Sequence, residues 1–136
     1  MSDCIFCKIV NGTAPCMKLW EDEYTMAFMD IAKDVDGHLL VIPKAHKKNI
    51  LDCDEETLAH IMKTVKRISN HLVENCGYNG VNLLNASDES AGQDVFHFHI
   101  HIIPRKNNDN IHAWPPFNGA EHDIEEIYKK ISIKQD

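Results

Sequence analysis

Three histidines alternate with apolar residues in the segment DVFHFHIHIIPR, which begins at Asp94. Side chains two residues apart in a β-strand share a face, so a strand would place His97, His99 and His101 side by side. Val95 would face with them, and the opposite, buried face would carry Phe96, Phe98, Ile100 and Ile102. At ~3.3 Å per residue the rings span roughly 13 Å, too far for one metal ion to bind all three in an extended strand. The row therefore suits separate roles along an extended substrate, such as a phosphate with groups on both sides.

The loop SAGQD directly precedes the histidines and could hold such a phosphate. Gly92 allows backbone N–H groups to approach an anion closely, and the amide of Gln93 can donate a hydrogen bond. A neutral imidazole near pH 7 can then act as a nucleophile or as an acid and base. Burial of three histidines without such a role would cost several kcal/mol, which makes a purely structural explanation less favourable.

The pair Cys4 and Cys7 has the C-x-x-C spacing of metal ligands. A zinc site needs two more ligands, and His46 and His97 are candidates. The alternative is a reduced pair of half-buried thiols. The remaining cysteines have no partner pattern and are expected only to pack: Cys16, Cys53 and Cys76.

The composition is that of an ordinary globular protein, with 43% hydrophobic and 26% charged residues and a formal net charge of −7. The negative charge argues against a broad nucleic-acid surface, and no apolar run approaches the ~20 residues of a membrane span. An odd number of cysteines without a secretory signal favours a reducing, cytoplasmic environment over a disulfide framework. We therefore expect a single domain over residues 1–136, with no nucleic-acid or membrane partner.

Hydrophobic periodicity predicts an α+β domain, an antiparallel sheet with helices packed on one face. Helices are expected where apolar residues recur at helical spacing: in CIFCKIVNGT, from Asp54 to Cys76, and over residues 121–134. Strands are expected in KLWEDEYTMAFMDI, which forms two around a turn, in GHLLVIPKAH, in GVNLLNAS, and in the histidine segment.

The segment HFHIHII is similar to the His-φ-His-φ-His-φ-φ signature of the histidine triad (HIT) family, where φ is apolar. AFMDI, GHLLVIPKAH, LLNAS, AGQDVFHFHIHIIPR and WPPF resemble the blocks of that family in its order, so the resemblance covers residues 3–117. It implies a HIT-like fold and a homodimer whose sheet continues across the subunits. It also implies nucleotidyl hydrolase or transferase activity on nucleoside monophosphate esters, amides or anhydrides.

The resemblance gives three histidines catalytic roles. His99 resembles the nucleophile that takes the nucleotidyl group, and water would then attack the covalent nucleotidyl-histidine. His101 would lie beside the leaving-group atom and the phosphate. His38, in GHLLVIP, matches a fourth histidine that supports the nucleophilic ring.

The resemblance also implies a set of substrate contacts. Asn85 and Gln93 match phosphate contacts, and Asp30 matches the acid that holds the ribose hydroxyls, for which two carboxylate oxygens make a suitable fork. The base pocket would be formed by Ile5, Phe6, Ile9, Phe28, Ile31 and Leu40, although their residue types fit a plain core equally well. Trp114, beside two prolines, is either a residue that reaches toward the partner's site or a packing anchor.

One position departs from the family pattern. Asp94 stands where many relatives have Ser or Thr beside the phosphate, and a carboxylate repels a phosphate at short range. Its backbone N–H could still bind the phosphate while the side chain turns outward.

Some bacterial-type members of the family bind a structural zinc through a C-x-x-C pair, a histidine after IPK and the first triad histidine. The equivalent residues here are Cys4, Cys7, His46 and His97. The resemblance thus implies a structural zinc ion, with no cofactor required for catalysis.

The sequence resembles the Hint-like, bacterial HIT nucleotide hydrolases, which implies cleavage of the AMP–N bond of purine nucleoside phosphoramidates. A dinucleoside polyphosphate hydrolase of the same family is the first alternative. A nucleotide-binding regulatory module with incidental hydrolysis is an alternative of another class, and it predicts affinity without turnover. A catalytic metalloenzyme with the triad as ligands is disfavoured by the length of the histidine strand.

Overall fold

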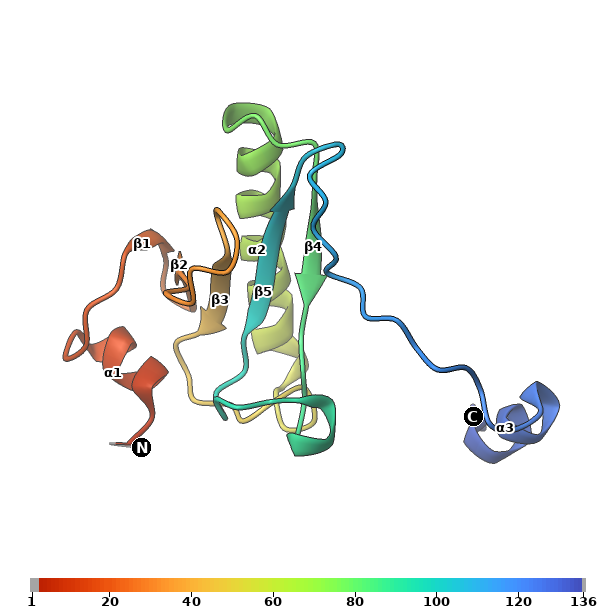
Figure 1. The fold of residues 1–136 in the computed structure, drawn as a ribbon. Coiled ribbons are helices and arrows are strands. Elements are labelled where there is room, and N and C mark those ends of the chain that lie inside the picture. Colours follow the sequence, from red (N-terminus) through yellow and green to blue (C-terminus); the bar gives the residue numbers. More distant parts are fainter. Residues whose placement is uncertain (1–2, 136) are drawn as a thin grey trace.

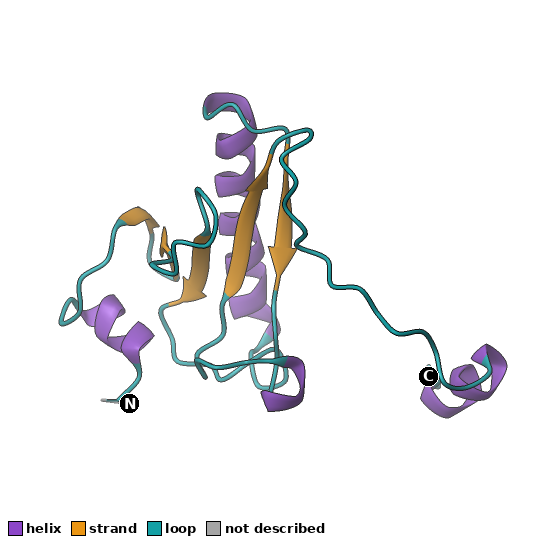
Figure 2. Ribbon diagram, viewed as in Figure 1, coloured by secondary structure: helices purple, strands orange, loops and turns teal. Residues whose placement is uncertain are grey.

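A single antiparallel sheet of five strands, in the order β1-β2-β3-β5-β4, organises the computed structural model, which describes residues 3–135 (Figures 1 and 2). Its elements are α1 (Ile5–Asn11), β1 (Lys18–Glu21), β2 (Thr25–Met29), β3 (Leu39–Pro43), α2 (Glu55–Asn75), β4 (Gly80–Leu84), a 3₁₀ turn (Glu89–Ala91), β5 (Ile100–Arg105) and α3 (Ile124–Ile131). The α+β class and the antiparallel sheet are confirmed. Residues 1, 2 and 136 of the expected domain lie outside the described part.

Helix α2 begins and ends as its sequence predicts. The side chain of Asp54 accepts a hydrogen bond from the backbone N–H of Thr57 and caps the first turn, and Gly77 follows the helix with a φ of +84°. One stripe of the helix is buried against the sheet, at Ile61, Thr64, Val65, Ile68 and Leu72. This packing covers one face of the sheet and forms the larger core.

The two faces of β2 and β3 pack against different helices. Ala27, Leu39 and Val41 belong to the core beneath α2. The alternate residues Met26, Phe28, Leu40 and Ile42 pack instead against Phe6 and Ile9 of α1. Alternation along a strand sends successive side chains to opposite faces, so α1 lies on the face that α2 leaves open. Figure 1 shows α2 behind β5 and α1 well apart from it, on the side of β2 and β3.

The histidine segment is only partly a strand. β5 begins at Ile100, and a bend at residues 95–97 replaces the expected continuous strand. β3 ends at Pro43, which has no N–H to donate to a ladder, and its pairing with β5 runs only from Leu39 to Val41. Phe96 is 37% exposed, so its expected place in the core is wrong.

The alternation nevertheless continues through the bend. Phe98, Ile100 and Ile102 are buried in the core beneath α2. His97 and His99 contact the ring of Phe6 on the α1 side, and His101 pairs with Leu40, which also faces α1. The three histidines therefore lie on one side of the sheet, as the spacing predicts, but not in a straight row.

The chain after β5 leaves the body of the domain. Arg105 binds Asp109 at 2.8 Å and Asn82 at 2.6 Å, and beyond this point the backbone runs outward to α3 (Figure 1). α3 occupies residues 124–131 of the expected 121–134, and it has no buried residue. Within residues 3–135, no helix combines the length and the apolar character needed to cross a membrane.

Candidate active site

A cavity of about 530 Å³ lies between α1 and the sheet. The six residues expected to form the base pocket all line it: Ile5, Phe6, Ile9, Phe28, Ile31 and Leu40. Asp30, Asp94, His99 and His101 also line it, so polar groups meet an apolar hollow. An apolar cavity with a few convergent polar groups is the usual form of a small-molecule site. Sequence reasoning missed the other lining residues, which are Ala14, Pro15, Cys16, Met29, Ala32 and Val95.

His99 is held in one orientation by the backbone on both sides of it. Its Nδ1 donates a hydrogen bond to the carbonyl oxygen of His97 at 2.7 Å. The carbonyl of His99 itself accepts from Nδ2 of Asn85 at 2.8 Å, and the ring of Phe6 meets the imidazole edge-on at 5.2 Å. A neutral ring with its proton on Nδ1 carries its lone pair on Nε2, which is the nitrogen left for the cavity.

Among the described residues, the side chain of His38 contacts Asp34 and His101 and lies near Asp30, so the expected support of the nucleophilic ring by His38 stays a prediction. Nε2 of His38 lies 2.9 Å from Nδ1 of His101, and its Nδ1 lies 2.8 Å from a carboxylate oxygen of Asp34. Register explains the contact, because Leu39 and Leu40 of β3 pair with Ile102 and His101 of β5, next to His38. Sequence reasoning did not identify Asp34, although it stands four residues before His38.

Burial dominates the protonation of His101. Desolvation, with smaller effects from His99 and His38, lowers the pKa of His101 to about 4 against the opposing charges of Asp30 and Asp94. At pH 7 its imidazole is therefore neutral. An oxygen of Asp30 lies 3.5 Å from Nε2 of His38 and 4.0 Å from Nδ1 of His101.

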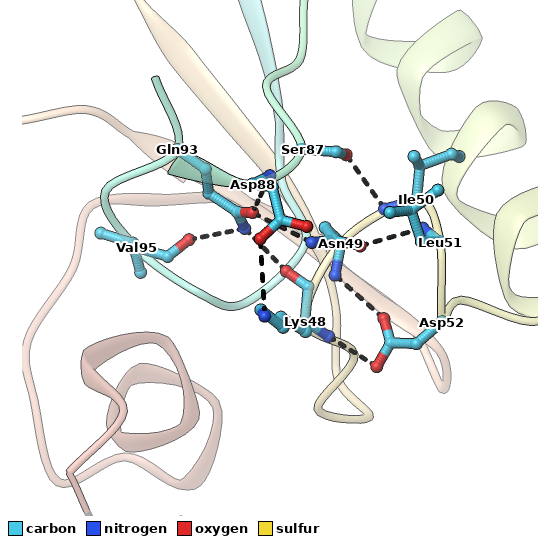
Figure 3. Close-up of polar contacts among 9 residues, drawn as sticks. All are labelled: Lys48, Asn49, Ile50, Leu51, Asp52, Ser87, Asp88, Gln93 and Val95. Carbon is cyan, nitrogen blue, oxygen red and sulfur yellow. Dashed lines mark hydrogen bonds and ion pairs between the residues drawn. The ribbon is translucent and has the colours of Figure 1, made fainter. Parts of the chain in front are cut away.

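The amide of Gln93 is engaged within the protein, which argues against the expected phosphate contact through this side chain. Both of its hydrogens are donated to backbone carbonyls, to Lys48 at 2.7 Å and Val95 at 3.1 Å. Its oxygen accepts from the N–H of Asp88 and the amide of Asn49 (Figure 3). Gln93 is 5% exposed and joins the loop after β3 to the loop before the histidines. An amide with all these bonds has no hydrogen left for a ligand.

The remaining predicted residues are placed less centrally. Gly92 is exposed with a φ of +92°, a left-handed conformation that favours glycine, and its N–H bonds back to Glu89. Asp94 is exposed at the edge of the cavity. Trp114 is 73% exposed on the segment that leaves the domain.

The four candidate metal ligands converge on one point. The ligand atoms of Cys4, Cys7, His46 and His97 all lie within 4.8 Å of one another. Nε2 of His97 donates to the carbonyl of Pro43 at 2.8 Å, and burial lowers the pKa of His97 to about 4. His97 is therefore neutral, with the lone pair of Nδ1 directed at the other three side chains. A hydrogen bond from the second ring nitrogen to a carbonyl is the usual support of a metal-bound histidine.

Comparison with known proteins identifies one family whose members match this chain. A family model described as HIT domain matches residues 11–108. The adenosine 5′-monophosphoramidase of Schizosaccharomyces pombe is 38% identical over 133 residues, which cover 96% of this chain and 97% of that protein. An adenylylsulfatase of Arabidopsis thaliana is 41% identical over 112 residues, covering 82% of this chain and 57% of that protein. A solved zinc-bound histidine triad family protein from Mycobacterium smegmatis is 36% identical, with a TM-score of 0.79 and coverage of 82% and 81%.

Proposed function

This chain belongs to the HIT family and is a nucleotide hydrolase, and from that premise we propose that it cleaves the P–N bond of purine nucleoside phosphoramidates through a covalent nucleotidyl-histidine. The observation that carries this proposal is the hydrogen bond from Nδ1 of His99 to the carbonyl of His97, at 2.7 Å. It fixes the tautomer in which Nε2 has a lone pair at the cavity. A histidine so oriented is a prepared nucleophile toward phosphorus.

In the first step, Nε2 of His99 forms a bond to the α-phosphorus while the bond between phosphorus and the leaving amine breaks. The amine gains one proton as it leaves. In the second step, water adds its oxygen to phosphorus, the His99–phosphorus bond breaks, and water gives up one proton. A single group beside the leaving atom can thus donate the first proton and accept the second, and we assign that role to His101. An anionic phosphoryl group near His101 opposes the effect of burial and raises its pKa for the first transfer.

We place the substrate with its base at the apolar end of the cavity and its ribose and phosphate at the polar end. The purine would stack among the apolar side chains near Phe6 and Phe28, whose rings meet edge-on at 5.6 Å. Asp30, at the polar end, would accept hydrogen bonds from the ribose hydroxyls; one of its oxygens already accepts from the N–H of Ala32. The phosphate would lie at His99 and His101, near the backbone of Asp94. The apolar residues support a base, and the acid beside them supports a sugar.

The proposal includes a structural zinc ion held by Cys4, Cys7, His46 and His97. A tetrahedral zinc, with Zn–S near 2.3 Å and Zn–N near 2.0–2.1 Å, places S and N ligands about 3.5 Å apart and two N ligands about 3.3 Å apart. The corresponding separations here are 3.3–3.6 Å for sulfur to nitrogen and 3.2 Å for nitrogen to nitrogen. When bound, zinc would join α1 to the histidine segment and need take no part in the reaction.

The proposal also includes a homodimer in the cytoplasm. The segment after β5 exposes large apolar side chains, among them Trp114 and Phe117, which a second copy would cover. None of the five cysteines is paired in a disulfide, which supports a reducing compartment.

The test compares AMP release from an adenosine phosphoramidate, diadenosine triphosphate and adenylylsulfate, with wild type and His99→Ala. We expect the phosphoramidate to be cleaved fastest, and His99→Ala to lose turnover by at least about 10³-fold while it still binds AMP. Quenched wild-type reactions should contain nucleotidyl-enzyme, located on His99 by peptide mass analysis. Turnover of His99→Ala at the wild-type rate would refute the nucleophile.

The three substrates separate the alternatives. A preference for diadenosine triphosphate would make the protein a dinucleoside polyphosphate hydrolase with the same nucleophile. A preference for adenylylsulfate would match the activity in the name of the Arabidopsis thaliana relative. AMP binding without release of product from any of them would favour a regulatory nucleotide-binding module.

A further inference from the structure

A chain of three hydrogen-bonded side chains runs from the surface to the cavity. A carboxylate oxygen of Asp34 lies 2.8 Å from Nδ1 of His38, and Nε2 of His38 lies 2.9 Å from Nδ1 of His101. His101 ends the chain at the cavity wall. His38 is 7% exposed, whereas the side chain of Asp34 is 54% exposed and lies on the loop between β2 and β3.

The direction of these bonds follows from the carboxylate. An ionised carboxylate only accepts hydrogen bonds, so Nδ1 of His38 must carry the proton. Its hydrogen bond to His38 is the main reason that the pKa of Asp34 is lowered, which keeps Asp34 ionised near neutral pH. The same oxygen of Asp34 accepts from the N–H of Val35 at 2.9 Å, so the carboxylate is held toward the ring.

The proton on Nδ1 of a neutral His38 leaves its Nε2 with a lone pair. At 2.9 Å that lone pair accepts a hydrogen bond from Nδ1 of His101, so the proton of neutral His101 also sits on Nδ1. Nε2 of His101, the nitrogen away from His38, is then unprotonated. That state suits the second step of the proposed reaction, in which water must give up a proton.

The other charged groups near His38 and His101 affect the positions of the ring protons less than Asp34 does. Asp30 faces both rings, but its nearest approaches, 3.5 Å to His38 and 4.0 Å to His101, exceed normal hydrogen-bond distances. Asp94 acts on His101 through its charge and without a direct hydrogen bond. The shortest contact, to Asp34, therefore decides which nitrogen of His38 is protonated.

We propose that Asp34 is a positioning residue which, through His38, keeps the proton of neutral His101 on Nδ1, so that after the leaving amine has taken its proton Nε2 of His101 faces the attacking water with a lone pair. The role in catalysis rests on the proposed function, whereas the proton positions do not. Without Asp34, the proton of His38 can move to Nε2 and donate to Nδ1 of His101. The proton of His101 then moves to its own Nε2, which has no lone pair left for the proton of water.

The first test measures proton positions directly. Long-range ¹H–¹⁵N NMR spectra of the histidine rings would be recorded for wild type, Asp34→Ala and Asp36→Ala. Asp36 is an exposed acid on the same loop, so its variant matches the change in charge without breaking the chain of bonds. We expect Nδ1–H tautomers of His38 and His101 in wild type and Asp36→Ala, and a shift toward Nε2–H for both in Asp34→Ala. Unchanged tautomers in Asp34→Ala would overturn the proposal.

The second test measures the step that depends on His101. In Asp34→Ala we expect kcat for the phosphoramidate to fall by about 10- to 100-fold, with nucleotidyl-enzyme accumulating because its hydrolysis is slowed. Asp34→Glu should recover part of the rate. A tautomer shift without loss of kcat, or loss without accumulation of nucleotidyl-enzyme, would overturn the catalytic part.

The two tests remain informative if Asp34→Ala folds poorly or if the wild type is inactive. If Asp34→Ala folds poorly, Asp34→Asn keeps the side-chain shape and serves for the same two measurements. If wild type cleaves none of the substrates, the proposed function fails while the NMR comparison still decides whether Asp34 sets the proton positions.

Discussion

At the scale of single residues, at least one ring nitrogen of each site histidine is already bonded within the protein. Nδ1 of His99 bonds the backbone, Nε2 of His97 bonds the carbonyl of Pro43, and Nδ1 of His38 bonds Asp34. Each bond fixes a tautomer and so decides where the lone pair lies. The same residue type thereby gains different chemistry at neighbouring positions, with a metal-facing nitrogen on His97 and a cavity-facing nitrogen on His99.

Gln93 provides the prediction at this scale. Gln93→Leu keeps similar volume but leaves the carbonyls of Lys48 and Val95 and the N–H of Asp88 without their partner. We expect the free energy of unfolding to fall by about 2–3 kcal/mol, because buried polar groups lose their hydrogen bonds. Chemical denaturation measures this, with Gln135→Leu, an exposed glutamine, as the matched control.

The two explanations of Gln93 differ in what they change. A residue that joins two loops lowers stability when it is replaced, and it lowers kcat as the histidine segment loosens. A phosphate contact would instead raise KM for the substrate with little change in stability. The second pattern would contradict the structural role assigned here.

Residue spacing was enough to predict that the three histidines share a face and that Cys4 and Cys7 could be metal ligands, because strand alternation and C-x-x-C spacing are local properties. The nucleophilic role of His99 was implied by the resemblance to the HIT family. The partners of His38 and Gln93 could not be predicted in this way. Both are set by contacts between distant segments: His38 with His101, 63 residues away, and Gln93 with Lys48, 45 residues away. A list of donors in a sequence does not say which hydrogens are already used.

At the scale of elements, α1 is a short helix that few buried side chains attach to the sheet. Phe6 and Ile9 are its buried residues, and seven residues make a marginal helix in water. Its first turn also carries Cys4 and Cys7, which meet His46 and His97 from other segments. Since α1 forms one wall of the cavity, the metal ligands and the substrate site share this element.

Cys4→Ser tests the contribution of zinc to this attachment. Sγ of Cys4 caps α1 by accepting from the N–H of Cys7 at 3.4 Å, and serine is a favourable cap. The change therefore keeps the cap while it removes a metal ligand. We expect the zinc content to fall from about one ion per chain toward zero and Tm to drop by roughly 5 °C or more. Metal analysis and calorimetry measure both.

The exposed Cys76 offers a matched control, because Cys76→Ser removes a thiol far from the cluster in sequence. It should leave zinc content and Tm unchanged. Equal zinc content and equal Tm in wild type and Cys4→Ser would contradict a structural zinc site.

Helices and most strands followed from the sequence, because apolar spacing, Asp54 as a cap and glycine after α1 and α2 are local signals. The start of β5 did not. His97 bonds Pro43 and turns toward the cysteines, and the bend that this requires removes residues 95–97 from the sheet. A long-range cluster thus overrides a local preference for strand, which is the usual reason for a misplaced boundary.

At the scale of the whole molecule, the sheet separates two functions. α2 and its core stabilise one face, whereas the other face, with α1, forms the cavity. The segment after β5 belongs to neither layer and extends from the domain (Figure 1). On it, Ile124 is 82% exposed, Tyr128 68% and Ile131 67%, so an amphipathic helix has no apolar surface beneath it.

The last prediction concerns what covers α3. We expect light scattering to give a mass of two chains, twice 15.5 kDa, because a second copy can bury the apolar side of this helix. Burial of a large apolar side chain contributes about 1.5–3 kcal/mol, so Ile131→Glu should weaken the dimer at least about 10-fold. Lys129→Glu, on the same helix, is the control for added negative charge and should weaken the dimer far less. A wild-type mass of one chain at micromolar concentration would contradict the dimer. A dimer equally strong in Ile131→Glu would place the interface elsewhere. The next site to vary would then be the exposed edge strand β4, at Leu83.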